Sequence, residues 1–217
     1  MSNKNQSLLK EIKKSGILRL ILNEPKNKNA LSKKMISKLK EAISFASSDD
    51  LVKVIIIAAN GNVYSAGHDL KEITEARFHK DDGNSYFRDL FNSCSDLMKL
   101  IVESPKPIIA EVNGVATAAG CQLVASCDLA ISSDDSRFAT PGVNIGLFCS
   151  TPMVALSRSI SKKDAMKMLL TGDMITANEA KSISLINDHV PEEELTESVM
   201  QLAQKIAQKS SMTLKIG

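Results

Sequence analysis

The stretch from Ala110 to Asp128, AEVNGVATAAGCQLVASCD, decides the fold of this chain. The short apolar run from Ile108 to Val112 predicts a buried strand, and Asn113-Gly114 ends that run with turn chemistry. Small residues follow up to Gly120, and Gln122 to Ala125 predict a helix. Small side chains between a strand and a helix let another group approach the backbone closely.

The first amides of such a helix have no internal acceptor and lie at its positive end. The stretch therefore predicts a site for an anion, or for an oxygen that becomes negative during a reaction. Close packing at a tight strand-to-helix crossing is the alternative reason for the small residues.

A second copy of this pattern lies upstream. Residues 60–70 and 113–123 both read N-G-x4-A-G-x2-L, and each follows an apolar run and precedes a predicted helix. Two such turns at one sheet edge would direct backbone amides into one pocket. The alternative is that strand–turn–helix units reuse the same turn residues.

The rest of the chain alternates strands with helices and then becomes helical, which is typical of an α/β domain with a helical extension. Periodicity predicts strands at 16–22, 51–59, 108–112 and 129–132, and helices at 30–47, 86–101, 152–160, 163–170 and 194–208. Residues 76–85 are expected to form a mobile loop, 137–142 a turn, and 144–151 a loop or short strand. Gly172 suits a left-handed helix end, and Thr176 with Glu179 predicts a capping box at the start of a further helix.

Composition excludes several classes of function. The net charge of +2 and the eight aromatic residues give little basis for nucleic-acid binding. No apolar run approaches the length of a membrane span, and the start of the chain lacks a secretory signal. The four cysteines show neither CxxC nor Cys/His metal spacing, so we expect free thiols, a reducing compartment and no metal site. Cytoplasmic location is expected, with the mitochondrial matrix as the alternative because the start is rich in lysine.

Four stretches together resemble the crotonase superfamily, the enoyl-CoA hydratase/isomerase group. They are residues 23–32 (NEPKNKNALS), 62–72 (NVYSAGHDLKE), 112–131 (VNGVATAAGCQLVASCDLAI) and 137–148 (RFATPGVNIGLF). The region 168–191 is similar to the part of the family that precedes its trimer-forming helices. The resemblance implies an α/β fold, a crotonase-type spiral of ββα units with a shortened helical C-terminal region. A core domain is expected over 1–190, and 191–217 would be the start of a C-terminal helical region, apparently truncated.

The resemblance also implies an acyl-CoA small molecule as substrate or ligand, with no separate cofactor because coenzyme A is part of the substrate. Two backbone amides, those of His68 and Ala119, would form an oxyanion hole for the thioester carbonyl. The expected assembly is a homotrimer or a dimer of trimers. Positions that the resemblance implies for substrate binding are Lys26, Lys28, Asn29, Ala30, Leu31, Ala66, Asp69, Leu70 and Cys149.

The chain departs from the family where hydratases carry two carboxylates. These positions hold Gln122 and Gly142, and neither residue can accept a proton at neutral pH. We therefore expect weak or absent classical hydration. The resemblance then implies an enolate-forming lyase or isomerase of fatty acid metabolism or a thioester hydrolase, with a degenerate acyl-CoA-binding protein without turnover as the alternative. A generic α/β scaffold for protein partners is a further alternative. Among the other acids, we expect Asp69 to cap a helix, Glu111 to point away and Asp128 to hold the loops.

Overall fold

The computed structural model describes residues 6–13 and 15–216, which form a mixed α/β fold. The strands are β1 (Leu8–Lys13), β2 (Ile17–Leu22), β3 (Val54–Ala59), β4 (Val63–Ser65), β5 (Ile108–Val112), β6 (Val115–Thr117), β7 (Leu129–Ser133), β8 (Arg137–Ala139), β9 (Ile175–Thr176) and β10 (Asp188–Val190). The α-helices are α1 (Lys33–Ser48), α2 (Leu70–Ala76), α3 (Asn84–Val102), α4 (Ala119–Ser126), α5 (Ser150–Ser159), α6 (Lys162–Thr171), α7 (Ala177–Ser182), α8 (Glu192–Ala207) and α9 (Ser211–Ile216). Two 3₁₀ turns, η2 (Pro25–Asn27) and η3 (Pro141–Ile145), complete the described chain.

The strands form two sheets. The larger has the order β1-β2-β3-β5-β7-β10, antiparallel only between β1 and β2. The smaller has the order β4-β6-β8-β9, in which β4, β6 and β8 are parallel. In each of the consecutive pairs β3-β4, β5-β6 and β7-β8, the first strand belongs to the larger sheet and the second to the smaller one. The chain therefore winds between the two layers. This winding brings the carboxyl ends of β4, β6 and β8 to one edge.

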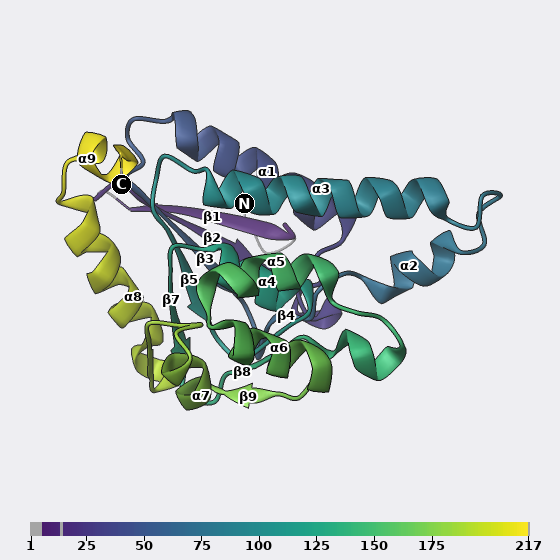
Figure 1. Ribbon diagram of the computed structural model, residues 1–217. Coiled ribbons are helices and arrows are strands. Elements are labelled where there is room, and N and C mark those ends of the chain that lie inside the picture. The colour runs from purple at the N-terminus through teal and green to yellow at the C-terminus, as the bar shows by residue number, and fades with distance from the viewer. Residues whose placement is uncertain (1–5, 14, 217) are drawn as a thin grey trace.

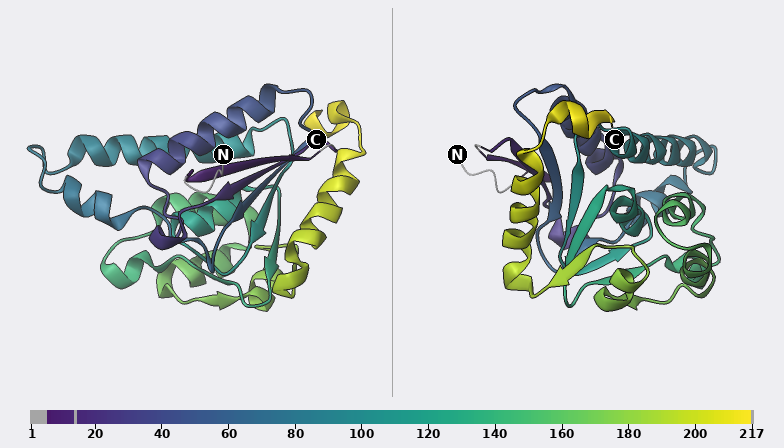
Figure 2. Two further views of the ribbon diagram at one scale, coloured as in Figure 1. Left: turned by 180° about the vertical axis from the view of Figure 1, so that it is seen from behind. Right: turned by 60° about the vertical axis from the view of Figure 1, so that its left-hand side comes forward.

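Apolar residues on both faces of the large sheet explain its two covers. One face packs against the main core, to which α1, α3 and α4 contribute. The other face, with Ile17, Val54 and Ile109, packs against Leu195 and Val199 of α8. Figure 1 and Figure 2 show α8, in yellow-green, along the side of the sheet opposite α3.

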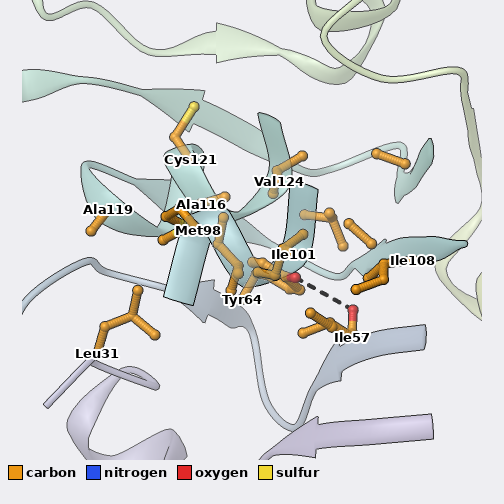
Figure 3. Close-up of a cluster of buried hydrophobic side chains, with 14 of the residues drawn as sticks. Leu31, Ile57, Tyr64, Met98, Ile101, Ile108, Ala116, Ala119, Cys121 and Val124 are labelled. Atoms are coloured by element: carbon orange, nitrogen blue, oxygen red, sulfur yellow. Dashed lines mark hydrogen bonds between the residues drawn. The ribbon is translucent and has the colours of Figure 1, made fainter. Parts of the chain in front are cut away.

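The main core meets α4 beneath the strand ends of the small sheet. Figure 3 shows Ala119 and Cys121 of α4 above Leu31, with Met98 of α3 and Tyr64 close by. Tyr64 is fully buried and its hydroxyl donates to the Ile57 carbonyl at 3.4 Å. The start of α4 is therefore supported by packed side chains from several distant segments.

The structure differs from the sequence prediction mainly in short elements. The strand β4 lies within residues 62–69, and β8 lies within 137–142, which was expected as a turn; residues 144–151 hold the last two residues of η3 and a loop rather than a strand. The strands β1 and β10 and the helix α9 were not predicted. The expected loop at 76–85 is shorter, because α3 begins at Asn84. Both helix-end predictions are confirmed: Gly172 has φ 67°, and Thr176 forms a capping box with Glu179.

Candidate functional site

The two copies of the N-G-x4-A-G pattern lie side by side. Strands β4 and β6 pair in parallel, with Val63 opposite Val115. A Cβ atom on Gly120 would overlap the Ser65 carbonyl, so only glycine fits where α4 begins to cross β4. The repeated pattern is therefore explained by two similar turns packed directly against each other.

Gly67 packs against the turn that starts α4. It has φ 88°, and a Cβ placed on it would lie 2.9 Å from the Ala118 Cβ and 3.1 Å from the Ala119 nitrogen. His68, the next residue, is thus adjacent in the chain to a glycine that touches Ala118 and Ala119. Ala119 is the first residue of α4, where amides have no intrahelical acceptor.

Ala118 holds this turn in a conformation that alanine rarely adopts. Its φ and ψ are 51° and −121°, and its amide donates to the Ala139 carbonyl at 3.0 Å. Such backbone conformations persist only where the surroundings enforce them, and they concentrate at functional sites. Here the hydrogen bond to β8 and the contact with Gly67 enforce the turn that starts α4.

The His68 side chain lies between Leu31, in the loop before α1, and Phe91 of α3. Its Nδ1 is 3.4 Å from the Leu31 carbonyl oxygen, and its ring packs edge-on against Phe91 with the ring centroids 5.5 Å apart. Burial lowers the pKa of His68, against smaller raising effects of the Leu31 carbonyl and Glu72. The imidazole is therefore neutral at pH 7.

Three buried polar atoms without partners belong to residues that follow strands of the small sheet. Among the buried side-chain atoms that lack a hydrogen bond in the described residues are His68 Nε2, Gln122 Oε1 and Thr140 Oγ1. These residues follow β4, β6 and β8 respectively. Because buried polar groups are normally hydrogen-bonded, each of these atoms indicates a place for a polar ligand atom or a water.

Gln122 and Gly142, the two positions without acids, have different surroundings. Gln122 is buried on the first turn of α4 and lines a cavity between α3, α4 and α5. Gly142 is packed closely: a Cβ there would lie 2.7 Å from the Leu147 carbonyl oxygen and 2.8 Å from Cys149 Sγ. Cys149 thus occupies the space beside Gly142, where the resemblance led us to look for the second acid.

Cys149 is half-buried at the start of α5. Burial raises the pKa of its thiol, and a hydrogen bond with the Gly142 backbone opposes part of that rise. No histidine is hydrogen-bonded to it in the described part of the chain. The thiol is therefore protonated at neutral pH and is not activated as a nucleophile.

The loop before α1 adjoins the His68 segment through its backbone. The Ala66 amide donates to the Lys28 carbonyl at 3.0 Å, and the Leu31 amide donates to the Gly67 carbonyl at 2.7 Å. Lys26 and Lys28 are exposed. They lie on the same loop as these contacts, so both are free to approach an anionic ligand there.

Three predicted substrate-binding residues on this loop have interior side chains. Asn29 is fully buried, accepts the Glu24 amide, and donates to the carbonyls of Asn60 and Val63. Ala30 and Leu31 are buried as well. Their side chains build the loop, so any ligand contact from these three positions would have to come from the backbone.

The acids near the site have structural roles, as expected. Asp69 caps α2 and accepts Asn27 Nδ2 at 2.6 Å. Burial favours its neutral form, but hydrogen bonds from Asn27 and the α2 amides outweigh this and lower its pKa. Leu70, which follows it, is 63% exposed.

The other two acids lie away from this edge. Glu111 pairs with Arg19 on the face covered by α8. Asp128 Oδ2 accepts the Ile108 amide at 2.7 Å, which fastens the end of α4 to the start of β5. No group of three His, Cys, Asp or Glu side chains that could hold a metal occurs in the described residues.

Comparison with known proteins places the chain in a family. Residues 12–216 match the family model described as enoyl-CoA hydratase/isomerase. The chain belongs to the enoyl-CoA hydratase/isomerase family. Enoyl-CoA hydratase domain-containing protein 3, mitochondrial, from Xenopus laevis is 52% identical over 202 residues, covering 93% of this chain and 67% of the relative. The protein of that name from Homo sapiens is 50% identical and is covered to 65%.

Solved structures of the enoyl-CoA hydratase/isomerase family share the fold. The crystal structure of human enoyl Coenzyme A hydratase domain-containing protein 3 matches with a TM-score of 0.91 and 46% identity, over 98% of this chain and 81% of that chain. An enoyl-CoA hydratase from Mycobacterium smegmatis matches with a TM-score of 0.92 and 42% identity, over the same shares. The crotonase fold expected from the sequence is confirmed. The chain spans about two thirds of the length of the curated relatives it matches.

The cavity beside Gln122 is the part of the site that sequence reasoning missed. It lies between three helices that are distant in sequence, so no local motif marks it. Its apolar residues Val102 and Val154 remain 63% and 44% exposed on α3 and α5, which only the folded chain shows. None of the helices in the described ranges has the length and apolarity of a membrane span.

Proposed function

We propose that this chain binds acyl-CoA thioesters at the carboxyl ends of β4, β6 and β8, with the amides of His68 and Ala119 polarising the thioester carbonyl. The observation that carries the proposal is the contact of Gly67 with Ala118 and Ala119, which brings the two amide-bearing turns together. Two preorganised backbone donors stabilise the negative charge that an enolate or tetrahedral intermediate places on oxygen; losing one such donor typically costs about 2.7–4 kcal/mol.

Lys26 and Lys28 support the same proposal. Both are exposed on the loop that hydrogen-bonds to the Ala66–Gly67 segment. Each would act as a point charge toward the phosphates of coenzyme A. Ala66 and Leu70 flank the His68 turn, so they would lie along the path of the pantetheine arm.

The ¹³C resonance of the thioester carbonyl provides a direct test of the proposed oxyanion hole. Binding of an acyl-CoA labelled with ¹³C at the thioester carbon should move the carbonyl resonance downfield, because two donors draw electron density from it. Ala119→Pro removes one donor at a first helical position, where proline is tolerated, and should reduce that displacement. Ala177→Pro, at the first position of α7, is the matched control. An unchanged carbonyl resonance in a saturated complex would refute the oxyanion hole.

Hydration is expected to be weak or absent, because Gln122 and Gly142 stand where two acids would move protons. Turnover of crotonyl-CoA by the purified protein at about 10 s⁻¹ or more, an ordinary enzyme rate, would contradict this.

A binding protein without turnover is the second candidate. It is favoured by the protonated thiol of Cys149 and by the lack of a carboxylate at the two acid positions. Thermal stabilisation by CoA esters, without conversion of enoyl-, malonyl- or hydroxyacyl-CoA, would select it. Conversion of any of these would select a lyase or isomerase instead.

Two further expectations concern the cellular setting. Relatives named mitochondrial support the mitochondrial alternative for this chain, which imaging of the tagged full-length protein tests. The trimer stays a prediction, and light scattering of the purified protein measures it.

A further inference from the structure

A cavity of about 480 Å³ lies between α3, α4 and α5. Its walls are largely apolar: Met98, Val102, Ala125, Val154 and Ala155 line it. Gln122 is 5% exposed, and its Oε1 has no hydrogen-bond partner. An unpartnered amide oxygen this deeply buried beside apolar side chains indicates that the cavity receives a ligand with some polarity near that point.

The cavity has a defined direction relative to the proposed thioester position. Ala119, Gln122 and Ser126 are spaced three and four residues apart on α4, so they share one face. The cavity includes Gln122, Ala125 and Ser126, and therefore runs from the start of α4 toward its end. Over the seven steps from Ala119 to Ser126, a rise of about 1.5 Å per residue gives a length of about 10 Å.

The neighbouring helices determine which side chains line the end of the cavity that is farther from Ala119. Ser159 Oγ donates to the Ala125 carbonyl at 2.8 Å, which places the end of α5, with Arg158, beside the end of α4. The Ile108 amide donates to Asp128, which brings the segment after α3 to the same place. Arg158, Lys99 and Glu103 line this part of the cavity.

The two cations at the far end of the cavity make no ion pair with the described residues. Across residues 6–13 and 15–216, neither Lys99 nor Arg158 has a carboxylate within 4.0 Å, and Glu103 has no cation that close. The three side chains together give the lining a charge of +1. An arginine that is free of an ion pair can offer its guanidinium to a carboxylate in a bidentate geometry.

We propose that this cavity holds the acyl chain of the thioester and that the preferred acyl group is of medium length and ends in a carboxylate, which Arg158 binds with help from Lys99. The inference rests on the acyl-CoA binding proposed above and names the class of acyl group. A short acid is a poorer fit, because its carboxylate would end beside Val154, Ala155 and Met98 and would not reach Arg158.

Calorimetric titration of the full chain with suberyl-CoA, octanoyl-CoA and acetyl-CoA tests this. Suberyl-CoA and octanoyl-CoA have equal chain length and differ in the terminal carboxylate. Suberyl-CoA should bind about fivefold more tightly, the upper range for a partly exposed ion pair. Arg158→Gln should abolish that preference by reducing the affinity for suberyl-CoA to that for octanoyl-CoA. Lys163→Gln, an exposed cation on α6 outside the cavity, is the matched control.

A second variant tests the location of the chain. Ala155→Trp fills the cavity from α5 and should weaken octanoyl-CoA and suberyl-CoA at least tenfold while sparing acetyl-CoA, with the melting temperature as a check on folding. Equal affinity for octanoyl-CoA and suberyl-CoA, or a preference that survives Arg158→Gln, overturns the carboxylate assignment and leaves acyl-CoA binding intact. Failure of all three esters to bind overturns the proposed function as well.

Discussion

At the scale of single residues, the surroundings of Gly142 leave no space for a side chain, and this limits which chemical groups can act at that position. Its amide and carbonyl lie in a tight turn closed by a hydrogen bond from the Leu147 amide at 2.9 Å. The space where a side chain would start is filled by Leu147 and Cys149. Restoring an acid here would therefore require the turn to open, in addition to replacing the residue.

Gly142→Ala should destabilise the protein, because a Cβ would press on a backbone oxygen and a sulfur atom. Overpacking of this kind typically costs about 1–3 kcal/mol. Urea denaturation measures the loss. Cys149→Ala added to Gly142→Ala should recover part of it, since one of the two close contacts disappears. A double variant less stable than Gly142→Ala would show that the sulfur is not the obstacle.

His68 should make stability depend on pH. Burial lowers its folded pKa below the unfolded value of about 6.5. Between the two pKa values the unfolded state therefore binds more protons than the folded state. The contribution of His68 to folding stability is fully present above pH 6.5 and is lost as the pH falls through the lower folded pKa. We expect His68→Asn to lose less stability than the parent chain between pH 7 and pH 5, measured by urea denaturation at each pH. An equal loss in both proteins would contradict this.

Residue roles were predicted unevenly. The positions of His68, Ala119, Gln122 and Gly142 followed from the family motifs, which are local in sequence. The interior role of Asn29 could not be predicted, because its three partners lie on a turn about 30 residues away and on its own loop. Only the folded chain shows that this asparagine is a structural residue.

At the scale of elements, α4 begins with a strained residue. Ala118 has a positive φ, which costs an alanine about 1–3 kcal/mol. We expect Ala118→Gly to be neutral or stabilising in thermal denaturation, because glycine adopts this backbone conformation freely. Ala125→Gly, inside the same helix, should lose about 1 kcal/mol. Equal destabilisation by both variants would show that the turn carries no strain.

Element length explains which parts of the fold were predicted. The strands β2, β3, β5 and β7 have five or six residues, and the helices α1, α3 and α8 have sixteen or more, so their periodicity is readable. The strands β4, β6, β8 and β10 have three residues each, too few to show alternation. The small sheet, which positions the site, was for that reason invisible to periodicity and entered only through the family resemblance.

At the scale of the whole molecule, one buried ion pair connects α8 to the large sheet. Arg19 on β2 makes two hydrogen bonds to Glu111 on β5, at 2.5 and 2.9 Å, and Thr196 on α8 donates to the same carboxylate at 2.7 Å. Glu111 is 4% exposed. The carboxylate thus ties two strands and the helix that covers them.

Removing one partner of this pair should be costly. Arg19→Met leaves the Glu111 charge buried beside the Thr196 hydroxyl, and such changes cost about 3–5 kcal/mol. The double variant Arg19→Met with Glu111→Leu should recover most of that loss, because no charge remains buried. Chemical denaturation of both variants provides the comparison, and a double variant as unstable as Arg19→Met would contradict it.

The thiol beside Gly142 also has a practical consequence. Cys94 and Cys121 are enclosed in the core, and Cys127 donates to the Leu123 carbonyl, whereas Cys149 is partly open at the edge of the site. An alkylating dye should therefore mark this single sulfur first, and any molecule lodged next to it should slow the labelling. Occupancy could then be followed by fluorescence even if the chain performs no reaction.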